Sequence, residues 1–579
     1  MMTLRSLTVN KSVPFLKRFY TTCFRIWSAP SERYQYSALP SLTCLKPTLC
    51  LLTCSKRPAR HVFSCSNGSL LWSHKGFHRN VVTSSSHIAQ QVKEFKDVPG
   101  PEGLSQWPVI GTVLNFKPFT NYTVWTLHLF FSSLIDQYGP IVRFQFAGPT
   151  VLLSDPRDAE ILFQNEGRYP NRPPIDLGDL YCKRNNLHGG FNELQGEDWY
   201  ALRSPANKRL LKPGSATHYL EQQNEVAKDL VGVLKKGPLS AEELADTFFK
   251  YASESIAVVC FNARLGFLEP PSRRSADTER FSQASLKHFQ LLMHSVTGES
   301  VAHRFYRNKT YREFEDTCNV MNEITDKYLH KAIAEVQFKK QEKSFDPNEP
   351  NLLYSFLSDS TLNYSRIKVI MNNLYNGGTD STAKNLMVLL FNLARNQDKQ
   401  QKLYEEIQTV LGPEQPLTKD ALAIMPYLKA CLRESFRLIN PTALSALRVL
   451  HHDTVIRGYR IPSGVAVAYS THKSSRENFV DPERYVPERW LRGPKQRREE
   501  ESHILANIPF GYGARGCLGR WFAEQEIYLA TVKILQNLQV HVHPDSQNTK
   551  FGYAIFVEPD KPIQFLFTRR ETADKTCVR

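Results

Sequence analysis

A single cysteine in a glycine-rich loop is the first feature of this 579-residue sequence that points to chemistry. The loop runs Phe510-Gly-Tyr-Gly-Ala-Arg-Gly-Cys517-Leu-Gly-Arg520, and its four glycines let the backbone fold tightly round the sulfur and turn N–H groups toward it. Residues at helical spacing follow, so Cys517 is predicted to stand just before a helix N-terminus. Loop N–H groups, the helix dipole and Arg515 would each favour the thiolate form of Cys517.

One thiolate with no second Cys or His nearby cannot build a zinc site, which needs several such ligands. It can serve as the single axial ligand of a haem iron, although a lone cysteine is usually just a small buried hydrophobe. The complete pattern F-x-x-G-x-R-x-C-x-G resembles the haem loop of cytochrome P450 monooxygenases. The resemblance implies haem b (iron protoporphyrin IX) as cofactor, with Cys517 as its axial thiolate and with Phe510 and Arg515 beside it.

A second candidate site interrupts a helical pattern with two glycines, at Asn376-Gly-Gly-Thr-Asp380-Ser381-Thr382. Adjacent glycines cost a helix about 1 kcal/mol each, and the missing side chains leave room for a ligand. The segment resembles the family's oxygen-activating motif, with Ser381 in place of a threonine. The resemblance implies that Ser381, backed by Asp380, relays protons to dioxygen. Loss of the methyl group frees the Ser381 rotamer and predicts leakier proton delivery. A kink caused by the glycines is the simple alternative.

Trp199 and Arg203 stand one turn apart on a predicted helix and form the pattern W-x-x-x-R. They share a helix face and offer an indole N–H and a guanidinium, both of which suit carboxylates. The family resemblance implies that this pair binds a haem propionate. It also implies that Arg448, His472 and Arg515 lie near the propionates. Taken singly, each of these residues is more often an ordinary surface residue.

Glu434 and Arg437 are three residues apart on one predicted helix, and Arg489 follows in the segment Pro487-Glu-Arg-Trp490. An exposed ion pair of little energetic value is the simple alternative. The three residues resemble the family's buried triad behind the haem. The resemblance implies that they support the thiolate loop and take no catalytic step.

Three basic residues, Lys429, Arg433 and Arg520, are predicted to lie around the thiolate loop, and solvated surface charge is their default interpretation. In mitochondrial members of the family, basic residues at these positions dock an acidic ferredoxin, whose approach electrostatic attraction would steer. Here Arg520 is followed by Trp521, where the family often has a second arginine. This departure predicts weaker or shifted docking.

The net charge of +16 is concentrated at the N-terminus. Residues 1–93 hold thirteen Lys and Arg against the single acid Glu32, and so carry +12 of the total. A segment rich in Ser, Thr, Arg and Lys and almost free of acids is typical of an organelle transit peptide, with a plain disordered tail as the alternative. No apolar run near the ~18 residues of a membrane anchor occurs in the first hundred positions. The nearly balanced remainder argues against nucleic-acid binding.

The folded body is predicted to begin at the Pro/Gly cluster Val98-Pro-Gly-Pro-Glu-Gly103, which cannot be helical. We therefore expect a mitochondrial transit peptide and flexible leader over 1–97 and a single large haem domain over 98–579. Helical patterns dominate the body, and strand-like runs occur at 141–146, 455–461 and 465–469. The fold class is mainly α with small β-sheets, which fits the cytochrome P450 fold. The eleven cysteines show no disulfide framework, so a reducing compartment is expected.

The stretches 168–172 and 196–214 resemble mitochondrial sterol and vitamin D side-chain hydroxylases. This resemblance implies a monooxygenase at the matrix side of the inner membrane, peripherally attached. It would insert one oxygen atom from O2 into a C–H bond of a lipophilic small molecule: a steroid, sterol or secosteroid. Electrons would come from a 2Fe-2S ferredoxin and its NADPH-dependent reductase. The alternatives are a xenobiotic-oxidising mitochondrial P450, a haem-thiolate isomerase or dehydratase, which Asp380 and Ser381 disfavour, and a non-enzymatic haem sensor or carrier.

Overall fold

The computed structural model describes residues 91–570 apart from 108–110, 112–113, 147, 174, 297–301, 347–349, 413–414, 492–502 and 554–555. Most of the predicted transit peptide and leader, residues 1–97, therefore lies outside the described residues. Ser86–Arg579 form one unit. Within this unit, Lys93 pairs with Tyr459 in a parallel β-bridge. The boundary placed at residue 97 stays a prediction.

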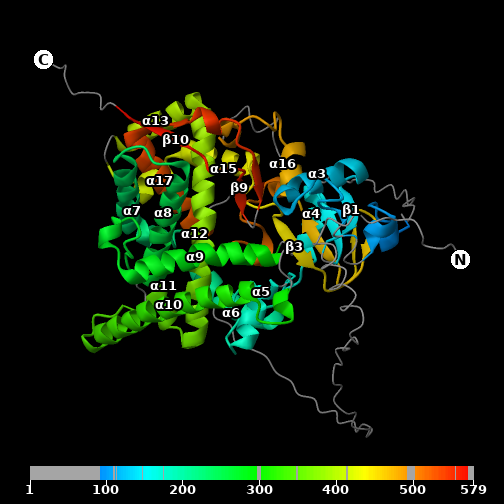
Figure 1. Ribbon diagram of the computed structural model, residues 1–579, viewed down its shortest axis with the longest axis horizontal. Coiled ribbons are helices and arrows are strands. Elements are labelled where there is room, and N and C mark those ends of the chain that lie inside the picture. Colours follow the sequence, from blue (N-terminus) through cyan, green and yellow to red (C-terminus); the bar gives the residue numbers. More distant parts are fainter. Residues whose placement is uncertain are drawn as a thin grey trace, which may run out of the picture. The chain divides into compact units, whose positions relative to one another are not determined.

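Helices make up most of the described chain and short strands form small sheets, which confirms the predicted fold class (Figure 1). The α-helices are α3 (Leu127–Tyr138), α4 (Pro156–Gln164), α5 (Asp176–Arg184), α6 (Gly196–Leu210), α7 (Leu220–Leu234), α8 (Ala241–Phe261), α9 (Ala276–Val296), α10 (Lys309–Gln341), α11 (Leu352–Leu357), α12 (Tyr364–Arg395), α13 (Gln397–Leu411), α14 (Lys419–Ala423), α15 (Pro426–Leu438), α16 (Thr471–Glu477) and α17 (Arg520–Asn537). The strands are β1 (Ile141–Gln145), β2 (Pro149–Leu153), β3 (Ala446–Val449), β4 (Thr454–Ile456), β5 (Tyr459–Ile461), β6 (Ala466–Tyr469), β7 (Leu538–Val542), β8 (Phe551–Tyr553), β9 (Val557–Pro559) and β10 (Phe565–Arg569).

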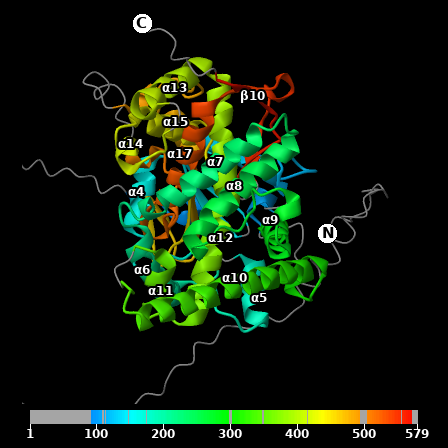
Figure 2. The same cartoon turned by 90° about the vertical axis from the view of Figure 1, so that its left-hand side faces the viewer.

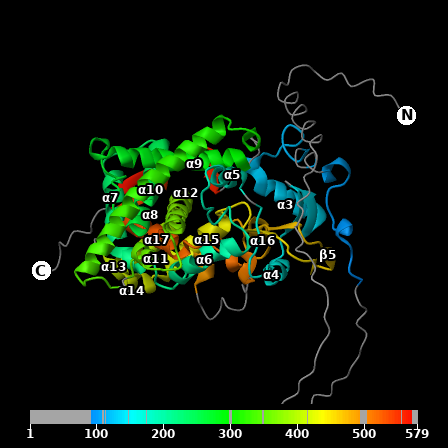
Figure 3. The same cartoon turned by 90° about the horizontal axis from the view of Figure 1, so that it is seen from below.

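The 32-residue helix α12 runs through the middle of the helical part of the molecule (Figure 1). Figure 2 shows it beside α8, its most extensive neighbour, and Figure 3 looks nearly along its axis. Residues 385–394 of α12 are buried on every face of the helix. A helix that is apolar all round can only be stable in a core, so the sequence of α12 places this helix at the centre of the fold.

The four-stranded sheet has the order β1-β2-β6-β3 and is antiparallel except between β2 and β6. Alternate residues of β2 enter different cores, because successive side chains of a strand point to opposite faces. Val151 and Leu153 pack in one hydrophobic cluster with α4, whereas Leu152 packs in another with α3. Held between these helices, β3 carries Arg448 opposite Val467 of β6.

The strand-like runs predicted from the sequence are confirmed as β1, the β4–β5 hairpin and β6. The hairpin turns through Arg457 and Gly458, whose φ angles are both positive at 50° and 80°. This is the geometry that two-residue hairpins favour, because its twist matches that of the strands.

The two glycines within α12 have different physical roles, and the helix continues through both of them. A Cβ atom at Gly378 would lie 2.7 Å from Cγ1 of Ile256 in α8, whereas a Cβ atom at Gly377 would meet nothing within 4 Å. The idea that both glycines open the helix surface for a ligand is therefore wrong for Gly378. That glycine lets α8 approach closely, and only Gly377 leaves an open surface.

The two glycines should respond differently to alanine. Gly378→Ala should lower the free energy of unfolding by about 1–3 kcal/mol, because the new methyl group overpacks the contact with the buried Ile256. Gly377→Ala is the matched control and should be neutral or raise stability by up to about 1 kcal/mol through helix propensity. Thermal unfolding of both variants measures the difference, and equal midpoints would contradict this account of the helix pair.

Candidate functional site

The loop around Cys517 folds back on itself directly before α17. The Cys517 N–H donates to the Phe510 carbonyl at 2.8 Å and so closes the loop at its base. Gly511 and Gly513 have φ angles of +68° and +71°, in the left-handed region where glycine is unstrained. The helix begins at Arg520, as the periodicity predicted. The sequence of the loop thus presents one sulfur at the start of a buried helix.

The Cys517 side chain is accessible to solvent, but protein atoms crowd the sulfur, and this burial raises the pKa of the thiol. The Gly519 N–H and the charges of Arg203 and Arg520 act in the opposite direction and lower that pKa. The expected contribution of Arg515 is thus supplied by two other arginines. All three favourable groups stabilise the thiolate, the form that ligates metal.

Four arginines converge at this loop, from four separate segments of the chain, and one of them belongs to the loop itself. They are Arg172, Arg203, Arg448 and Arg515. Burial and the other three guanidinium charges lower the pKa of Arg515 to about 9. Burial and neighbouring arginines likewise lower the pKa of Arg172 to about 10. Like charges this close and this desolvated are costly unless anions join them.

Carboxylates are scarce around this cluster among the described residues, and most of the acceptors that the arginines contact are neutral oxygens. Arg448 pairs with Glu166, from its Nε to Oε2 at 2.6 Å, and within the described part of the chain it is the only one of the four arginines with a carboxylate partner. Trp199 is 1% exposed, and its buried indole N–H has no hydrogen-bond partner among the residues that the structure describes. The Arg515 guanidinium lies 3.9 Å above the Trp199 ring. An excess of buried positive charge, with an unpartnered indole N–H beside it, fits a group that carries two carboxylates, as haem b does.

His472 lies apart from the arginine cluster. Its ring meets the His128 ring edge-on at 4.8 Å, and its Nδ1 lies 3.2 Å from Nη1 of Arg476. Burial and the Arg476 charge hold the pKa of His472 well below its usual range, so the imidazole is neutral. No hydrogen bond or ion pair joins His472 to the four arginines in the described structure. Its assignment to the propionates stays a prediction.

Two members of this cluster, Glu166 and Arg172, were not predicted from the sequence. Arg172 lies within a stretch that carried the family resemblance, and its spacing to other site residues gave no further signal. Its Nη2 donates to the Arg515 carbonyl at 2.9 Å. Glu166 offered no sequence signal, because its partner Arg448 is 282 residues away.

The polar residues of α12 are arranged differently from the motif's implied relay. Ser381 is partly exposed, and its hydroxyl donates to the Gly377 carbonyl at 2.6 Å. Asp380 pairs with Lys384 at 3.0 Å, and no hydrogen bond joins it to Ser381 among the described residues. Thr382 is 1% exposed, and its hydroxyl has no hydrogen-bond partner in the described structure. Ser381 thus lies beside the open surface at Gly377, with Asp380 bound elsewhere.

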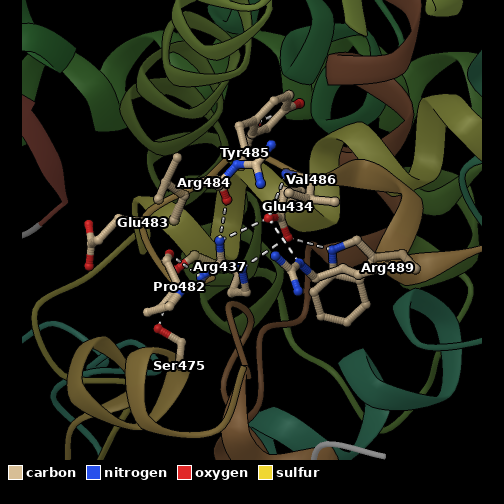
Figure 4. Close-up of polar contacts among 12 residues, drawn as sticks. Glu434, Arg437, Ser475, Pro482, Glu483, Arg484, Tyr485, Val486 and Arg489 are labelled. Carbon is tan, nitrogen blue, oxygen red and sulfur yellow. Dashed lines mark hydrogen bonds and ion pairs between the residues drawn. The ribbon is translucent and has the colours of Figure 1, made fainter. Parts of the chain in front are cut away.

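Glu434, Arg437 and Arg489 form one buried ionic cluster (Figure 4). Arg437 donates to both Glu434 oxygens, at 2.8 and 3.0 Å, and Arg489 donates to one of them at 3.1 Å. The Val486 N–H and the Trp490 indole add two further donors to the same carboxylate. A buried charge needs this degree of compensation. The arrangement ties α15 to residues 486–490.

The three basic residues that are predicted to bind a ferredoxin all lie near one acidic residue, Glu524. The charges of Arg520, Arg433 and Lys429 all act on Glu524, whose pKa burial raises and these charges lower. Arg520 pairs with Glu524 at 3.0 Å along α17. The Trp521 indole N–H donates to the Leu211 carbonyl at 3.3 Å and the ring packs against the core. The surface therefore carries less free charge than the sequence alone suggests.

No helix in the described part of the chain combines the length and apolar character that a bilayer span requires.

Comparison with known proteins identifies the family to which this chain belongs. Probable cytochrome P450 12a5, mitochondrial, of Drosophila melanogaster is 27% identical over 504 residues, 83% of this chain and 91% of the fly protein. The mitochondrial cholesterol side-chain cleavage enzyme of Homo sapiens is 29% identical over 486 residues, 82% of this chain and 89% of its own length. The mitochondrial 1,25-dihydroxyvitamin D(3) 24-hydroxylase of Mus musculus is 27% identical over 513 residues, 84% of this chain and 95% of its own length. The family model for cytochrome P450 matches residues 101–567. This chain therefore belongs to the cytochrome P450 family of haem-thiolate monooxygenases.

Proposed function

We propose that Cys517 is the axial thiolate ligand of haem b in this enzyme, and that the enzyme hydroxylates a sterol-like lipid in mitochondria. The observation that carries the proposal is the cluster of four arginines, with one carboxylate partner, beside a glycine-rich loop that presents a single sulfur. Haem held by a cysteine thiolate supplies one-electron and dioxygen chemistry, which amino-acid side chains alone lack.

Arg203, Arg448, Arg515 and Trp199 are the groups that would hold the two propionates. Glu166 offsets one of the three guanidinium charges, and the two charges that are left equal those of the two carboxylates. The three arginines are at most 5% exposed, so water solvates their charges poorly and an anion beside them is favoured. Arg172 joins them as a fifth donor. These residues orient the cofactor, while Phe510 closes the base of the thiolate loop and packs against Phe436, with ring centroids 5.4 Å apart.

The open surface at Gly377 is the proposed oxygen side of the site. The Ser381 hydroxyl donates its proton to the Gly377 carbonyl, and a change of the χ1 rotamer would redirect that bond. Asp380 forms an ion pair with Lys384, whose Nζ also lies 3.7 Å from Oε1 of Glu558. In this arrangement Ser381 delivers the proton, and the neighbouring ion pair of Asp380 and Lys384 keeps this part of the helix polar.

The substrate class follows from similarity. The human and mouse relatives are named for cholesterol and dihydroxyvitamin D(3), and they match nearly the whole folded part of this chain. We therefore propose a steroid, sterol or secosteroid as substrate. Side-chain contacts in a substrate pocket vary freely on one fold, so product analysis must name the compound.

The electron donor is proposed from the basic surface and from the mitochondrial names of the relatives. An acidic 2Fe-2S ferredoxin would bind at Lys429, Arg433 and Arg520, and an NADPH-dependent reductase would reduce that ferredoxin again after each electron transfer. An acidic partner is attracted to such a surface over about one Debye length. The basic, acid-poor segment 1–93 would direct the enzyme to the matrix side of the inner membrane, where it attaches peripherally.

The thiolate assignment has a direct spectroscopic test. Cys517→Ser should abolish the red-shifted Soret band of the reduced CO complex and remove hydroxylase activity, because a serine hydroxyl does not replace a thiolate ligand. Cys431→Ser is the matched control and should leave the band unchanged. A thiolate-type spectrum in the Cys517 variant would end the assignment.

The proposed delivery of protons by Ser381 is tested by measuring coupling, the amount of product formed per electron consumed. Ser381→Ala should retain haem and substrate binding, but product per electron should fall several-fold and peroxide should rise. The loss stays within the ~10²–10⁴-fold that positioned proton transfer contributes. Ser381→Thr should improve coupling, because the methyl group restricts the hydroxyl rotamers. Equal coupling in all three proteins would move the proton path to Thr382 or to water.

The docking surface is tested by charge reversal. Arg433 is exposed, and Arg433→Glu should raise the KM for ferredoxin about tenfold at low salt, because a rim charge acts mainly on association. The effect should shrink as salt screens it. Lys309→Glu, at a position 86% exposed on α10, is the control and should leave KM unchanged. An unchanged KM in the Arg433 variant, with an intact CO spectrum, would place the ferredoxin elsewhere.

A further inference from the structure

Glu166 has no role in the family motifs found in the sequence, yet it joins two parts of the proposed haem site. Its side chain is 7% exposed. One of its oxygens accepts the Arg448 Nε–H at 2.6 Å, and the other accepts the Ala514 N–H at 2.9 Å. A single carboxylate therefore links a propionate-side arginine to the backbone of the loop that carries Cys517.

The loop is shaped to receive this carboxylate. A Cβ atom at Gly513 would lie 2.9 Å from the carboxyl carbon of Glu166, so only glycine leaves the space that the carboxylate occupies. Arg448 also donates from Nη2 to the Tyr512 carbonyl at 3.0 Å. Residues 512–514 are thus held by Glu166 and Arg448 together. This close fit distinguishes the contact from an exposed ion pair, in which both partners keep their freedom.

In ferrous haem the iron and the porphyrin ring carry no net charge, and the charges of the proposed site then balance only when Glu166 is counted. Haem b would bring two propionates, and the Cys517 thiolate adds a third negative charge. The Glu166 carboxylate is the fourth, and together these offset the guanidinium charges of Arg172, Arg203, Arg448 and Arg515. Without Glu166, one buried positive charge would stay uncompensated, which is costly in a desolvated site.

We infer that Glu166 is a positioning residue of the haem site, which holds Arg448 and the Cys517 loop together and supplies the fourth negative charge. The inference rests on the proposed function, because the charge count includes the propionates and the thiolate. Glu166 acts through Arg448 and Ala514 and touches no reacting atom. Loss of its charge should ease reduction of the haem, since a surplus positive charge attracts the added electron.

The test uses the holoenzyme of the full chain. Glu166→Gln should raise the one-electron reduction potential, with a change in the reduction equilibrium of about tenfold, or about 59 mV. Glu166→Asp keeps the charge but is one methylene shorter, so it cannot reach Arg448 and Ala514 together. It should keep the potential near that of the wild type while the reduced CO complex loses part of its thiolate-type Soret band.

Glu160→Gln is the matched control, because Glu160 lies nearby on α4 but is 51% exposed and pairs with His503 at 3.4 Å. It should change neither the potential nor the spectrum. A purely structural role for Glu166 would lower stability in the Gln variant without shifting the potential, and an unshifted potential would overturn the inference.

A double variant covers the case in which Glu166→Gln does not retain haem. Glu166→Gln combined with Arg448→Gln removes one charge of each sign and should retain more haem than the single Gln variant. A double variant that is no better than the single would overturn the inference. Both negative outcomes leave the Cys517 result standing, whereas failure of the proposed function would appear as a thiolate-type band that survives Cys517→Ser.

Discussion

Uncompensated positive charge is the constraint on which the candidate site depends. The arginines there are held mainly by neutral acceptors: Arg515 donates to the carbonyls of Pro170 and Phe191, and Arg203 donates from Nε to the side chain of Asn207. Neutral oxygens accept hydrogen bonds from the guanidinium groups but do not neutralise their charge. Burial therefore lowers the pKa of Arg203 and Arg515. This part of the fold therefore favours the binding of anions, and it lies beside the glycine-rich loop that carries Cys517.

The ionic cluster at Glu434 shows the opposite balance with the same kinds of side chain. There, one carboxylate receives bonds from Arg437, Arg489, a backbone N–H and an indole, and Arg437 spends its remaining donors on the carbonyls of Pro482 and Arg484. Such a cluster has nothing left with which to bind a ligand, and its removal would strand a buried charge. One set of arginines is thus fully paired, while the other keeps an excess of positive charge. The difference lies in the number of carboxylates, which residue type alone does not reveal.

The features that could be predicted from the sequence are those that depend on local spacing. The start of α17 after Cys517, the β4–β5 hairpin and the pairing of Glu434 with Arg437 all depend on residues close together in the chain. The sequence could not reveal contacts that the fold alone creates. Ala514 lies 348 residues from Glu166, and the closeness of Gly378 to α8 depends on the packing of two helices. The motif around Asp380 was found, but its partner Lys384 competes for the carboxylate in a way that a motif does not encode.

Positive charge is also partly compensated on the basic surface formed by Lys429, Arg433 and Arg520, where electrons would enter. Glu524 lies within reach of three basic side chains and pairs with Arg520, so part of the positive potential is neutralised before a partner arrives. Trp521 adds an indole that is fixed to the Leu211 carbonyl, in place of a second mobile cation. Salt screens attraction between charges but has little effect on the burial of apolar area. Association through a surface with fewer free cations and one anchored indole therefore depends less on ionic strength, and more on shape, than association through charge alone.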